Sequence, residues 1–157
     1  MNFYNETLEW DEFCWEGTVD GPVLPTIKST TVDLVVETED EEEMPPHDLQ
    51  VETWRSLIEK GTDYSSMILS GFYDYYQLMR PHYLLSGEDC AKNMPEISSA
   101  TEIRPMLSLN SVNIGWPYDG VVAVGFAFEC QWDQEHGAGI VFKNGKQVDV
   151  GGVDCLY

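Results

Sequence analysis

Basic residues are scarce in this sequence. It contains 8 Lys and Arg residues against 28 Asp and Glu residues, and its formal net charge at pH 7 is −20. Binding to nucleic acid requires clustered Lys and Arg at the phosphates. Anionic membrane surfaces attract basic segments in the same way. The composition therefore predicts that the protein binds neither nucleic acid nor membranes.

Long apolar runs and paired cysteines are also absent from the sequence. No segment approaches the roughly 20 apolar residues that cross a bilayer. The stretch Met1–Glu6 has neither the basic nor the apolar region of a signal peptide. The cysteines are widely spaced and form no C-x-x-C pair, at positions Cys14, Cys90, Cys130 and Cys155. We therefore expect free thiols and a cytoplasmic location.

Sequence signatures of enzymes are missing as well. The chain contains no glycine-rich phosphate loop, no G-x-S-x-G elbow and no H-E-x-x-H metal motif. Of the histidines, His47 and His82 each follow a proline near an expected helix end, where a surface position is usual. We predict a protein that is not an enzyme, holds no metal and needs no cofactor.

The residues that are present suit one domain over residues 1–157, because 43% of them are hydrophobic. The predicted fold class is α+β, in which an antiparallel sheet packs against a central helical hairpin. The sheet would combine N-terminal strands with a C-terminal four-strand meander. The predicted segments are N-terminal strands in 1–36, an acidic loop in 37–45, the helical hairpin in 46–80, a loop with a short helix in 81–105 and the antiparallel meander in 106–150.

A strand in the C-terminal half has the clearest pattern. Large apolar side chains alternate with small or polar ones over Val121–Trp132. The apolar side consists of Val122, Val124, Phe126, Phe128, Cys130 and Trp132. Such a strand belongs inside a sheet, with something packed closely on each face. Farther along, Asn144 and Gly145 stand between two β-rich runs and predict a tight hairpin.

The first 36 residues are typical of short strands. Three runs rich in β-branched and aromatic residues are separated by turn signals such as Gly21-Pro22. We predict strands over Phe13–Val19, Val23–Ile27 and Thr31–Val36.

Two helices are predicted in the middle of the chain. The first follows Pro45-Pro46 and ends at Lys60, with Gly61 as its C-terminal cap. The second begins at Thr62 or Asp63 and stops at Pro81. Their apolar stripes contain Val51, Trp54, Leu57 and Ile58 in the first helix and Tyr64, Met67, Ile68, Gly71, Phe72, Tyr75 and Met79 in the second. Gly71 would let the second helix approach a neighbour closely.

The segment 37–43 is strongly acidic. Six of its seven residues are carboxylic acids, whose mutual repulsion makes a packed element unfavourable. We expect an exposed loop. Two interpretations remain open: a solvated connector, or a docking patch for a basic partner formed by Glu39, Asp40, Glu41, Glu42 and Glu43.

The loop after the central strand concentrates an indole, two carboxylates and an imidazole. In a bracing role, Asp133 accepts backbone N–H groups, Glu135 or a carbonyl holds His136, and Gly137 and Gly139 supply positive φ or close approach. Trp132 and the Asn144-Gly145 turn are structural in this interpretation. The alternatives are contact with a partner through Asp133, Glu135 and His136, or catalysis or metal binding by the same three residues.

These residues also carry a family resemblance. The run Phe128-x-Cys130-x-Trp132-Asp133-x-Glu135-His136-Gly137-x-Gly139-Ile140, followed by a hairpin and Val150-Gly151, resembles an uncharacterised bacterial domain family with an F-x-C-x-W-D-x-E-H-G-x-G signature. The aromatic pair Tyr75-Tyr76 fits as well, so the resemblance covers roughly residues 46–153. The resemblance implies no assigned reaction, but such small acidic domains are associated with polymorphic toxin systems as immunity proteins.

Taken together, the sequence predicts an acidic cytoplasmic binding protein with a basic protein partner. The leading hypothesis is an immunity protein that occludes the active site of a secreted bacterial toxin, with negative charge speeding the encounter. The alternatives are an enzyme or metal-binding protein that uses Asp133, Glu135 and His136, or an accessory structural domain without catalysis.

Overall fold

The computed structural model describes residues 1–157 apart from the side chains of Glu88 and Cys90. The predicted free thiol of Cys90 therefore lies outside the described residues, while Cys14, Cys130 and Cys155 are free. The strands are β1 (Asn2–Phe3), β2 (Glu6–Thr7), β3 (Glu9–Trp10), β4 (Cys14–Asp20), β5 (Thr31–Glu37), β6 (Leu107–Ile114), β7 (Ala123–Cys130), β8 (Ala138–Lys143) and β9 (Lys146–Gly151). The helices are α1 (Asp48–Glu59), α2 (Gly61–Leu84) and α3 (Glu88–Asn93), and short 3₁₀ turns are η1 (Glu39–Glu41), η2 (Ala100–Glu102), η3 (Arg104–Met106) and η4 (Val153–Leu156).

The α+β fold class is confirmed. A seven-stranded sheet has the order β3-β4-β5-β6-β7-β8-β9, and β1 and β2 form a separate two-stranded sheet. Strands β6 to β9 are the expected antiparallel meander. Asn144 and Gly145 turn β8 into β9 with positive φ angles of 51° and 70°, as a two-residue hairpin loop requires.

One pair departs from the expected antiparallel sheet. Strands β5 and β6 are parallel, with Leu34 opposite Val112 and Val36 opposite Ile114. A parallel pair requires a long connection between the end of one strand and the start of the next, and α1 and α2 lie in this connection. The two halves of the sheet are therefore joined side by side through a crossover.

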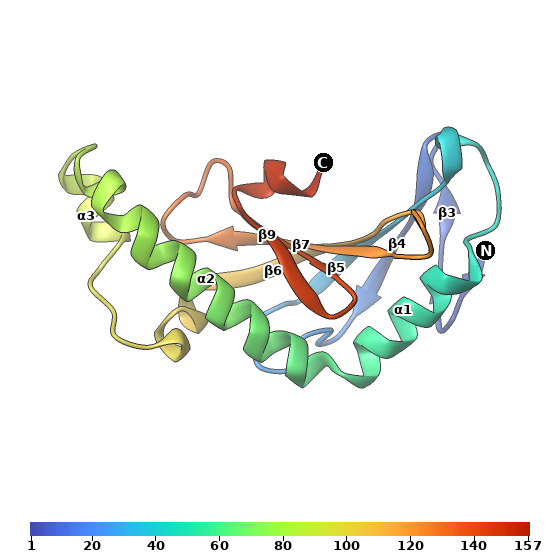
Figure 1. Cartoon of the computed structure of the whole chain (residues 1–157), viewed down its shortest axis with the longest axis horizontal. Helices are drawn as coiled ribbons and strands as arrows, with labels where there is room; N and C mark the ends of the chain where they lie inside the picture. The colour runs from blue at the N-terminus through green and yellow to red at the C-terminus, as the bar shows by residue number, and fades with distance from the viewer.

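Helices α1 and α2 pack on one face of the sheet (Figure 1). They differ from a folded-back hairpin, because only Lys60 separates them and they diverge as the arms of a wide V. Gly61 is the first residue of α2 rather than a cap, and a Cβ atom there would lie 2.7 Å from the carbonyl oxygen of Val23. Because Gly61 has no side chain, the start of α2 lies directly against Val23 and Pro25.

Helix α2 also continues through Pro81 to Leu84, so the predicted stop at Pro81 is wrong. Proline removes one backbone donor from a helix, but the last turn retains tertiary support. The hydroxyl of Tyr83 donates to the Asp133 carboxylate at 3.2 Å, which ties this turn to the loop after β7. The short helix α3 that follows was not predicted. The short helix that was predicted within 81–105 is the single turn η2, where Ser99 and Glu102 form a capping box, the pattern that the run Ser98–Glu102 indicates in the sequence.

The predicted strand over Val23–Ile27 is wrong as well. This segment is irregular, with a turn closed from the Ile27 N–H to the Leu24 carbonyl at 3.0 Å. Val23, Leu24 and Ile27 are nevertheless buried. The apolar residues therefore belong to the core without pairing in the sheet, because Pro25 in their midst lacks a donor for a ladder.

Strand β7 is covered on both faces, as its alternation indicates. Phe126 and Phe128 face the helices, where Tyr64 and Phe72 lie 5.8 and 5.3 Å away between ring centroids. The opposite face carries glycine and alanine, on which η4 packs. A Cβ atom at Gly125 would lie 2.8 Å from Leu156 Cδ2. Small residues on this face therefore let the C-terminal turn lie against the sheet.

The close approach expected at Gly71 is present. A Cβ atom there would lie 2.8 Å from Ile140 Cδ1 and would overlap the side-chain oxygen of Gln147. Helix α2 therefore rests directly on the β8–β9 hairpin. None of the helices that the structure describes is both long and apolar enough to cross a membrane.

Candidate functional site

The loop between β7 and β8 is anchored by Trp132. This side chain is only 5% exposed. Its ring packs edge-on against Tyr76 and Phe72 of α2, at centroid distances of 5.4 and 6.1 Å. A large rigid ring fixed by two aromatic neighbours leaves little rotamer freedom. The polar residues that follow Trp132 are thus held in a fixed position relative to α2.

Asp133 is the centre of the polar contacts in this loop. Its carboxylate accepts from the backbone N–H of His136 at 3.1 Å and from the His136 ring Nδ1 at 3.0 Å. The Tyr83 hydroxyl donates to the other carboxylate oxygen. The backbone carbonyl of Asp133 accepts a hydrogen bond from the Gly137 N–H at 2.9 Å. Asp133, rather than Glu135 or a carbonyl, therefore holds the imidazole.

These contacts change the proton affinities in the loop. Burial by itself would raise the pKa of Asp133, but hydrogen bonds from His136 and Tyr83 outweigh it and lower that pKa below its usual value. Burial and the neighbouring Asp133 charge raise the pKa of Tyr83 to about 12. The Asp133 carboxylate is therefore ionised at neutral pH, while the Tyr83 hydroxyl keeps its proton.

The loop does not present an activated nucleophile. The Cys130 thiol is buried and donates to the Asp133 backbone carbonyl at 3.4 Å. Burial raises the pKa of Cys130 to about 11, so the unreactive thiol form dominates at neutral pH. His136 is 74% exposed at its side chain, and Glu135 is also exposed. The observed geometry favours a braced loop that exposes a few polar groups at the surface.

Glycines close the loop on the sheet. Gly137 has φ +67°, and a Cβ atom there would lie 2.6 Å from the Phe128 carbonyl oxygen. Gly139 has no positive φ, but a Cβ atom there would lie 2.8 Å from Cys155 Sγ and 2.9 Å from the Gly152 carbonyl oxygen. Both glycines are thus placed where the loop and η4 approach the backbone of the sheet.

Replacing Asp133 by Asn tests this bracing through its pH dependence. The folded-state pKa of Asp133 lies below that of an unfolded Asp, about 3.9, so its ionised form adds stability above that pH. This contribution is lost as the pH falls through the folded-state pKa. We expect Asp133→Asn to lower the free energy of unfolding by at most about 1 kcal/mol at pH 7, because the pair is partly solvated.

Urea unfolding at pH 7 and at pH 3 provides the measurement. The difference between Asp133→Asn and the parent protein should shrink at pH 3. Glu135→Gln, an exposed neighbour, should show no such change. An Asp133→Asn difference that is the same at both pH values would contradict the role of the ionised carboxylate.

The acidic segment lies at the other end of the sheet. Glu39, Asp40, Glu41, Glu42 and Glu43 are all exposed, and η1 forms one turn among them. This segment follows β5 where Val36 pairs with Ile114, whereas the Asp133 loop follows β7 where Cys130 pairs with Leu107. Because these are opposite ends of β6, the structure separates the two groups predicted to bind a partner (Figure 1).

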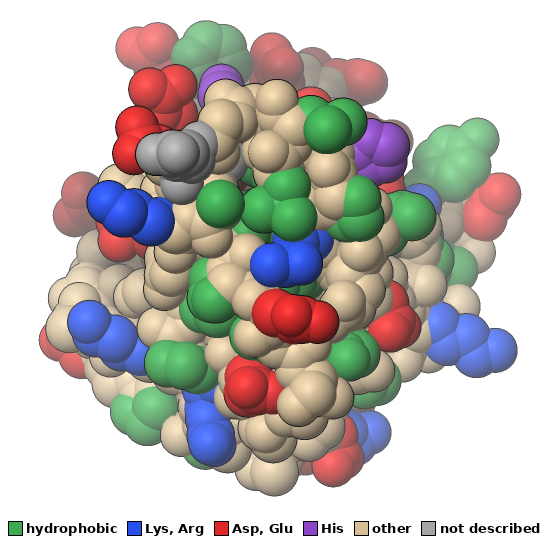
Figure 2. All heavy atoms as spheres, turned by 90° about the vertical axis from the view of Figure 1, so that its left-hand side faces the viewer, with side chains coloured by type: hydrophobic (Ala, Val, Ile, Leu, Met, Phe, Trp, Pro, Cys, Tyr) green, Lys and Arg blue, Asp and Glu red, His purple; other side chains and the backbone are tan. Residues whose placement is uncertain are grey.

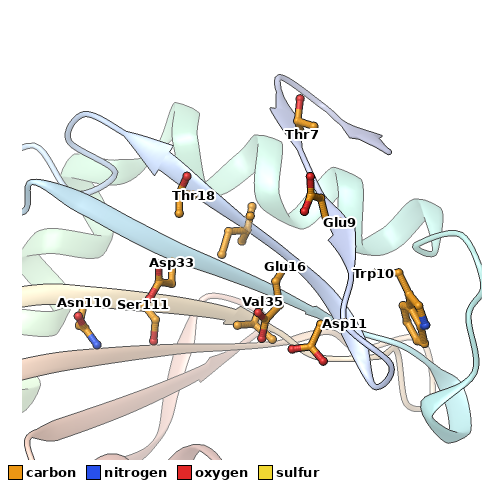
Figure 3. A pocket seen from close by; sticks show the side chains of 12 residues that line it. Thr7, Glu9, Trp10, Asp11, Glu16, Thr18, Asp33, Val35, Asn110 and Ser111 are labelled. Atoms are coloured by element: carbon orange, nitrogen blue, oxygen red, sulfur yellow. The ribbon is translucent and has the colours of Figure 1, made fainter.

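A third acidic surface was not predicted. Side chains of β3 to β6 that point away from the helices line a hollow of about 620 Å³, beneath the segment that leads into β3 (Figure 3). Its carboxylates are those of Glu9, Asp11, Glu16 and Asp33, and Trp10 lies at its rim. We call this surface the open face. The alternation of Glu16, Thr18 and Asp20 in β4 was the signal, but the strand register was needed to gather the charges.

Asp11 and Glu16 of the open face lie close to Cys14, and the spacing of these three residues alone would suit a metal. Ligand atoms of Asp11, Cys14 and Glu16 lie within 4.8 Å of one another. Burial, followed by the nearby carboxylates, raises the pKa of Cys14 to about 11. The metal ligand is the thiolate, so a thiol that keeps its proton is a weak donor here.

Comparisons with known proteins provide a family but no activity. Neither the curated proteins nor the solved structures include a match to this chain. A model for a domain of unknown function matches residues 4–157, which include the N-terminal strands as well as the Asp133 loop. The chain therefore belongs to the DUF6985 family, a domain of unknown function.

Proposed function

We propose that this protein captures a cationic protein partner on its open face, and that it acts as an immunity protein that occludes the active site of a secreted bacterial toxin. The observation that carries the proposal is the set of carboxylates gathered on the open face. Glu9 and Glu16 are direct cross-strand partners there. Like charges in such positions destabilise a sheet, and a basic partner would relieve this repulsion.

The distribution of charge supports the same surface. Residues 1–54 contain 15 of the 28 acidic residues and a single basic residue, Lys28. At the opposite end, Lys, Arg, Asp and Glu side chains are interspersed with hydrophobic ones (Figure 2). Acidic residues are thus concentrated in the part of the chain that supplies most of the open face and the acidic segment Glu39–Glu43, which begins two residues after β5 ends. A charge gradient of this kind orients an approaching cationic protein.

Few of these acids are neutralised within the protein. Among the side chains that the structure describes, an ion pair joins Arg55 to Glu52, and the His136 ring is hydrogen-bonded to Asp133. Neither contact includes a residue of the open face. The carboxylates of that face are therefore available to a partner without breaking an internal ion pair.

A nuclease toxin is the partner class that such a surface fits best. Its active site would carry basic groups for phosphates, and an array of carboxylates can take the place of phosphates there. Electrostatic steering can raise association rates by roughly 10- to 1,000-fold at low salt. Fast capture is what protection of a cell from a toxin requires.

Neutralising the open face should weaken the partner's association. We expect a triple variant, Glu9→Gln, Glu16→Gln and Asp33→Asn, to slow association about 10- to 100-fold at low salt and to flatten its salt dependence. The partner is the protein retained from the native strain on the immobilised chain at low salt and identified by mass spectrometry. Association rates are then measured with purified partner at several salt concentrations.

A matched control carries the same change of charge elsewhere. Glu59→Gln, Asp74→Asn and Glu96→Gln alter three exposed acids outside the open face and should change the association rate by less than about threefold. If both triple variants slowed association equally, net charge alone would explain the effect, and the proposal that the open face binds the partner would be wrong. Failure of the parent chain to protect cells that express the retained protein would contradict the immunity role.

A further inference from the structure

A second hollow, of about 470 Å³, lies beside the Asp133 loop. Its walls come from three parts of the chain: the C-terminal half of α2, the loop after β7, and the start of η4 with Gly152 before it. The side chains that matter for its chemistry are those of Tyr75, Tyr83, Trp132, Asp133, His136 and Asp154. The volume lies within the roughly 300–1,000 Å³ of ligand pockets, with room for one long side chain and its flanking backbone. We call it the aromatic hollow.

The aromatic wall of the hollow is preformed. Tyr75 and Tyr83 are eight residues apart in α2, which sets them about 80° apart around the helix axis, and both line the hollow. Trp132 completes the wall, fixed by its contacts with Tyr76 and Phe72. Aromatic faces attract cations through the negative charge density above the ring. A rigid wall offers this attraction with little loss of conformational entropy.

The polar side of the hollow is negative. The Asp133 carboxylate has a side-chain exposure of 21% and accepts from the Tyr83 hydroxyl and the His136 ring. Asp154 lines the same space. Burial, followed by the nearby Asp133 charge, raises the pKa of Tyr75, so its hydroxyl keeps its proton. Among the side chains that the structure describes, no Lys or Arg lines the hollow.

We propose that the aromatic hollow binds the ammonium or guanidinium group of a Lys or Arg side chain presented by a protein partner. The cation lies against the rings of Tyr75 and Tyr83 and is neutralised by Asp133 and Asp154, while the buried Trp132 fixes the loop that carries Asp133. A carboxylate has about four acceptor sites, so Asp133 can accept from the ligand while retaining its present donors. That the cation belongs to a protein rests on the proposed function. That the hollow prefers an organic cation rests on the residues of the hollow alone.

The site is distinct from the open face. It lies at the end of the sheet where β7 leads into the Asp133 loop, opposite the acidic segment. Its chemistry also differs, since aromatic rings supply part of the attraction. Salt strongly weakens the binding of a cation to a surface of carboxylates alone. Salt weakens cation–π binding in a partly buried hollow less. The two surfaces can therefore be tested separately.

The test is a titration of the full chain with small probes, followed by NMR. The probes are N-acetyl-arginine amide and N-acetyl-lysine amide, with N-acetyl-glutamine amide as the uncharged control. We expect the two cations to shift the signals of the Trp132 indole and the His136 ring in a saturable manner at about 150 mM salt. Tetramethylammonium is the second arm, which distinguishes a free organic cation from a side chain with flanking backbone.

Two variants examine the hollow and one examines the open face. Asp154→Asn should weaken binding of the cationic probes at least about threefold, and Tyr83→Leu at least about fivefold, by removing charge and ring surface respectively. Asp33→Asn, on the open face, should leave probe binding unchanged. Circular dichroism and urea unfolding identify any variant that fails to fold. If either Asp154→Asn or Tyr83→Leu fails to fold, probe binding to the other one tests the hollow.

The outcomes separate this inference from the proposed function. Equal response to the glutamine control, or a loss with Asp33→Asn as large as that with Asp154→Asn, would overturn the hollow as a cation site. Binding of tetramethylammonium as tight as that of the amino-acid amides would overturn the protein side chain as its ligand. A different pair of results would separate the two ideas: the probes bind saturably to the hollow, but the retained partner associates equally fast with the parent chain and the open-face triple variant. This result would support the hollow as a cation site and overturn the proposed function.

Discussion

Replacing Gln50 by Leu should lower the free energy of unfolding by about 2–4 kcal/mol. The Gln50 side chain is fully buried at the start of α1. Its amide nitrogen donates to the carbonyls of Glu37 at 2.9 Å, Ile114 at 3.2 Å and Gly115 at 3.0 Å. Its oxygen accepts from the His47 N–H at 2.9 Å. Leu fills much of the same space but leaves these groups without their partner.

The size of the effect follows from what Gln50 joins. The three carbonyls lie at the ends of β5 and β6, the parallel pair that unites the two halves of the sheet. A buried amide is thus the clamp between this pair and the helix that begins the crossover. Urea unfolding of Gln50→Leu at pH 7 measures the loss. Gln77→Leu is the matched control, because Gln77 is exposed and donates to one carbonyl, that of Ile97; it should cost less than about 1 kcal/mol.

Gln50→Glu provides a second measurement with a different signature. The introduced carboxyl would be buried against carbonyl oxygens, so its folded-state pKa would lie above the unfolded value of about 4.3. The destabilisation should be greatest at neutral pH and should decrease as the pH falls, when the protonated acid can donate. Gln50→Leu has no such group. If Gln50→Glu lost as much stability at pH 5 as at pH 8, the clamp would not depend on donation from residue 50.

Gln50 also shows why part of the fold was hidden in the sequence. The sequence pattern assigns the apolar stripe of α1 to Val51, Trp54, Leu57 and Ile58. In the structure Gln50 is buried with Trp54 and Leu57, while Ile58 is 39% exposed. Periodicity locates a helix, but it counts only apolar residues and cannot assign a polar one to the core. The parallel pairing of β5 with β6 was missed for a related reason. Alternation within a strand shows which side chains share a face, but it does not show which strand pairs with it or in which direction.

Local signals were more reliable where they fix backbone geometry. The Asn144-Gly145 turn, the Ser99 capping pattern and the small residues of β7 each demand a particular conformation or spacing. The structure has the features that these signals predict. The functional surfaces depend instead on distant contacts: Tyr83 reaches Asp133 across 50 positions, and Glu9 meets Glu16 only through the strand register. No local pattern contains that information.

Replacing Gly137 by Ala should lower the free energy of unfolding by about 2–4 kcal/mol. Two effects combine at this residue. Its φ of +67° is unfavourable for any residue with a Cβ atom, at a cost of roughly 1 kcal/mol. The added Cβ would also lie 2.6 Å from the Phe128 carbonyl oxygen and 3.1 Å from Val153 Cγ2. Backbone cannot move aside as a flexible side chain can, so the Asp133 loop must shift away from β7.

Gly145→Ala isolates the steric part of this loss. Gly145 has φ +70°, nearly the same as Gly137, but a Cβ atom there would have no described neighbour within 4 Å. Its replacement should therefore cost only the conformational term, about 1 kcal/mol. Urea unfolding of both variants measures the difference, and the Trp132 indole signal should shift in Gly137→Ala alone because the displaced loop carries Trp132. Equal losses in the two variants would mean that the loop yields freely, and the Asp133 carboxylate would then lack the fixed position on which both its hydrogen bonds and the aromatic hollow depend.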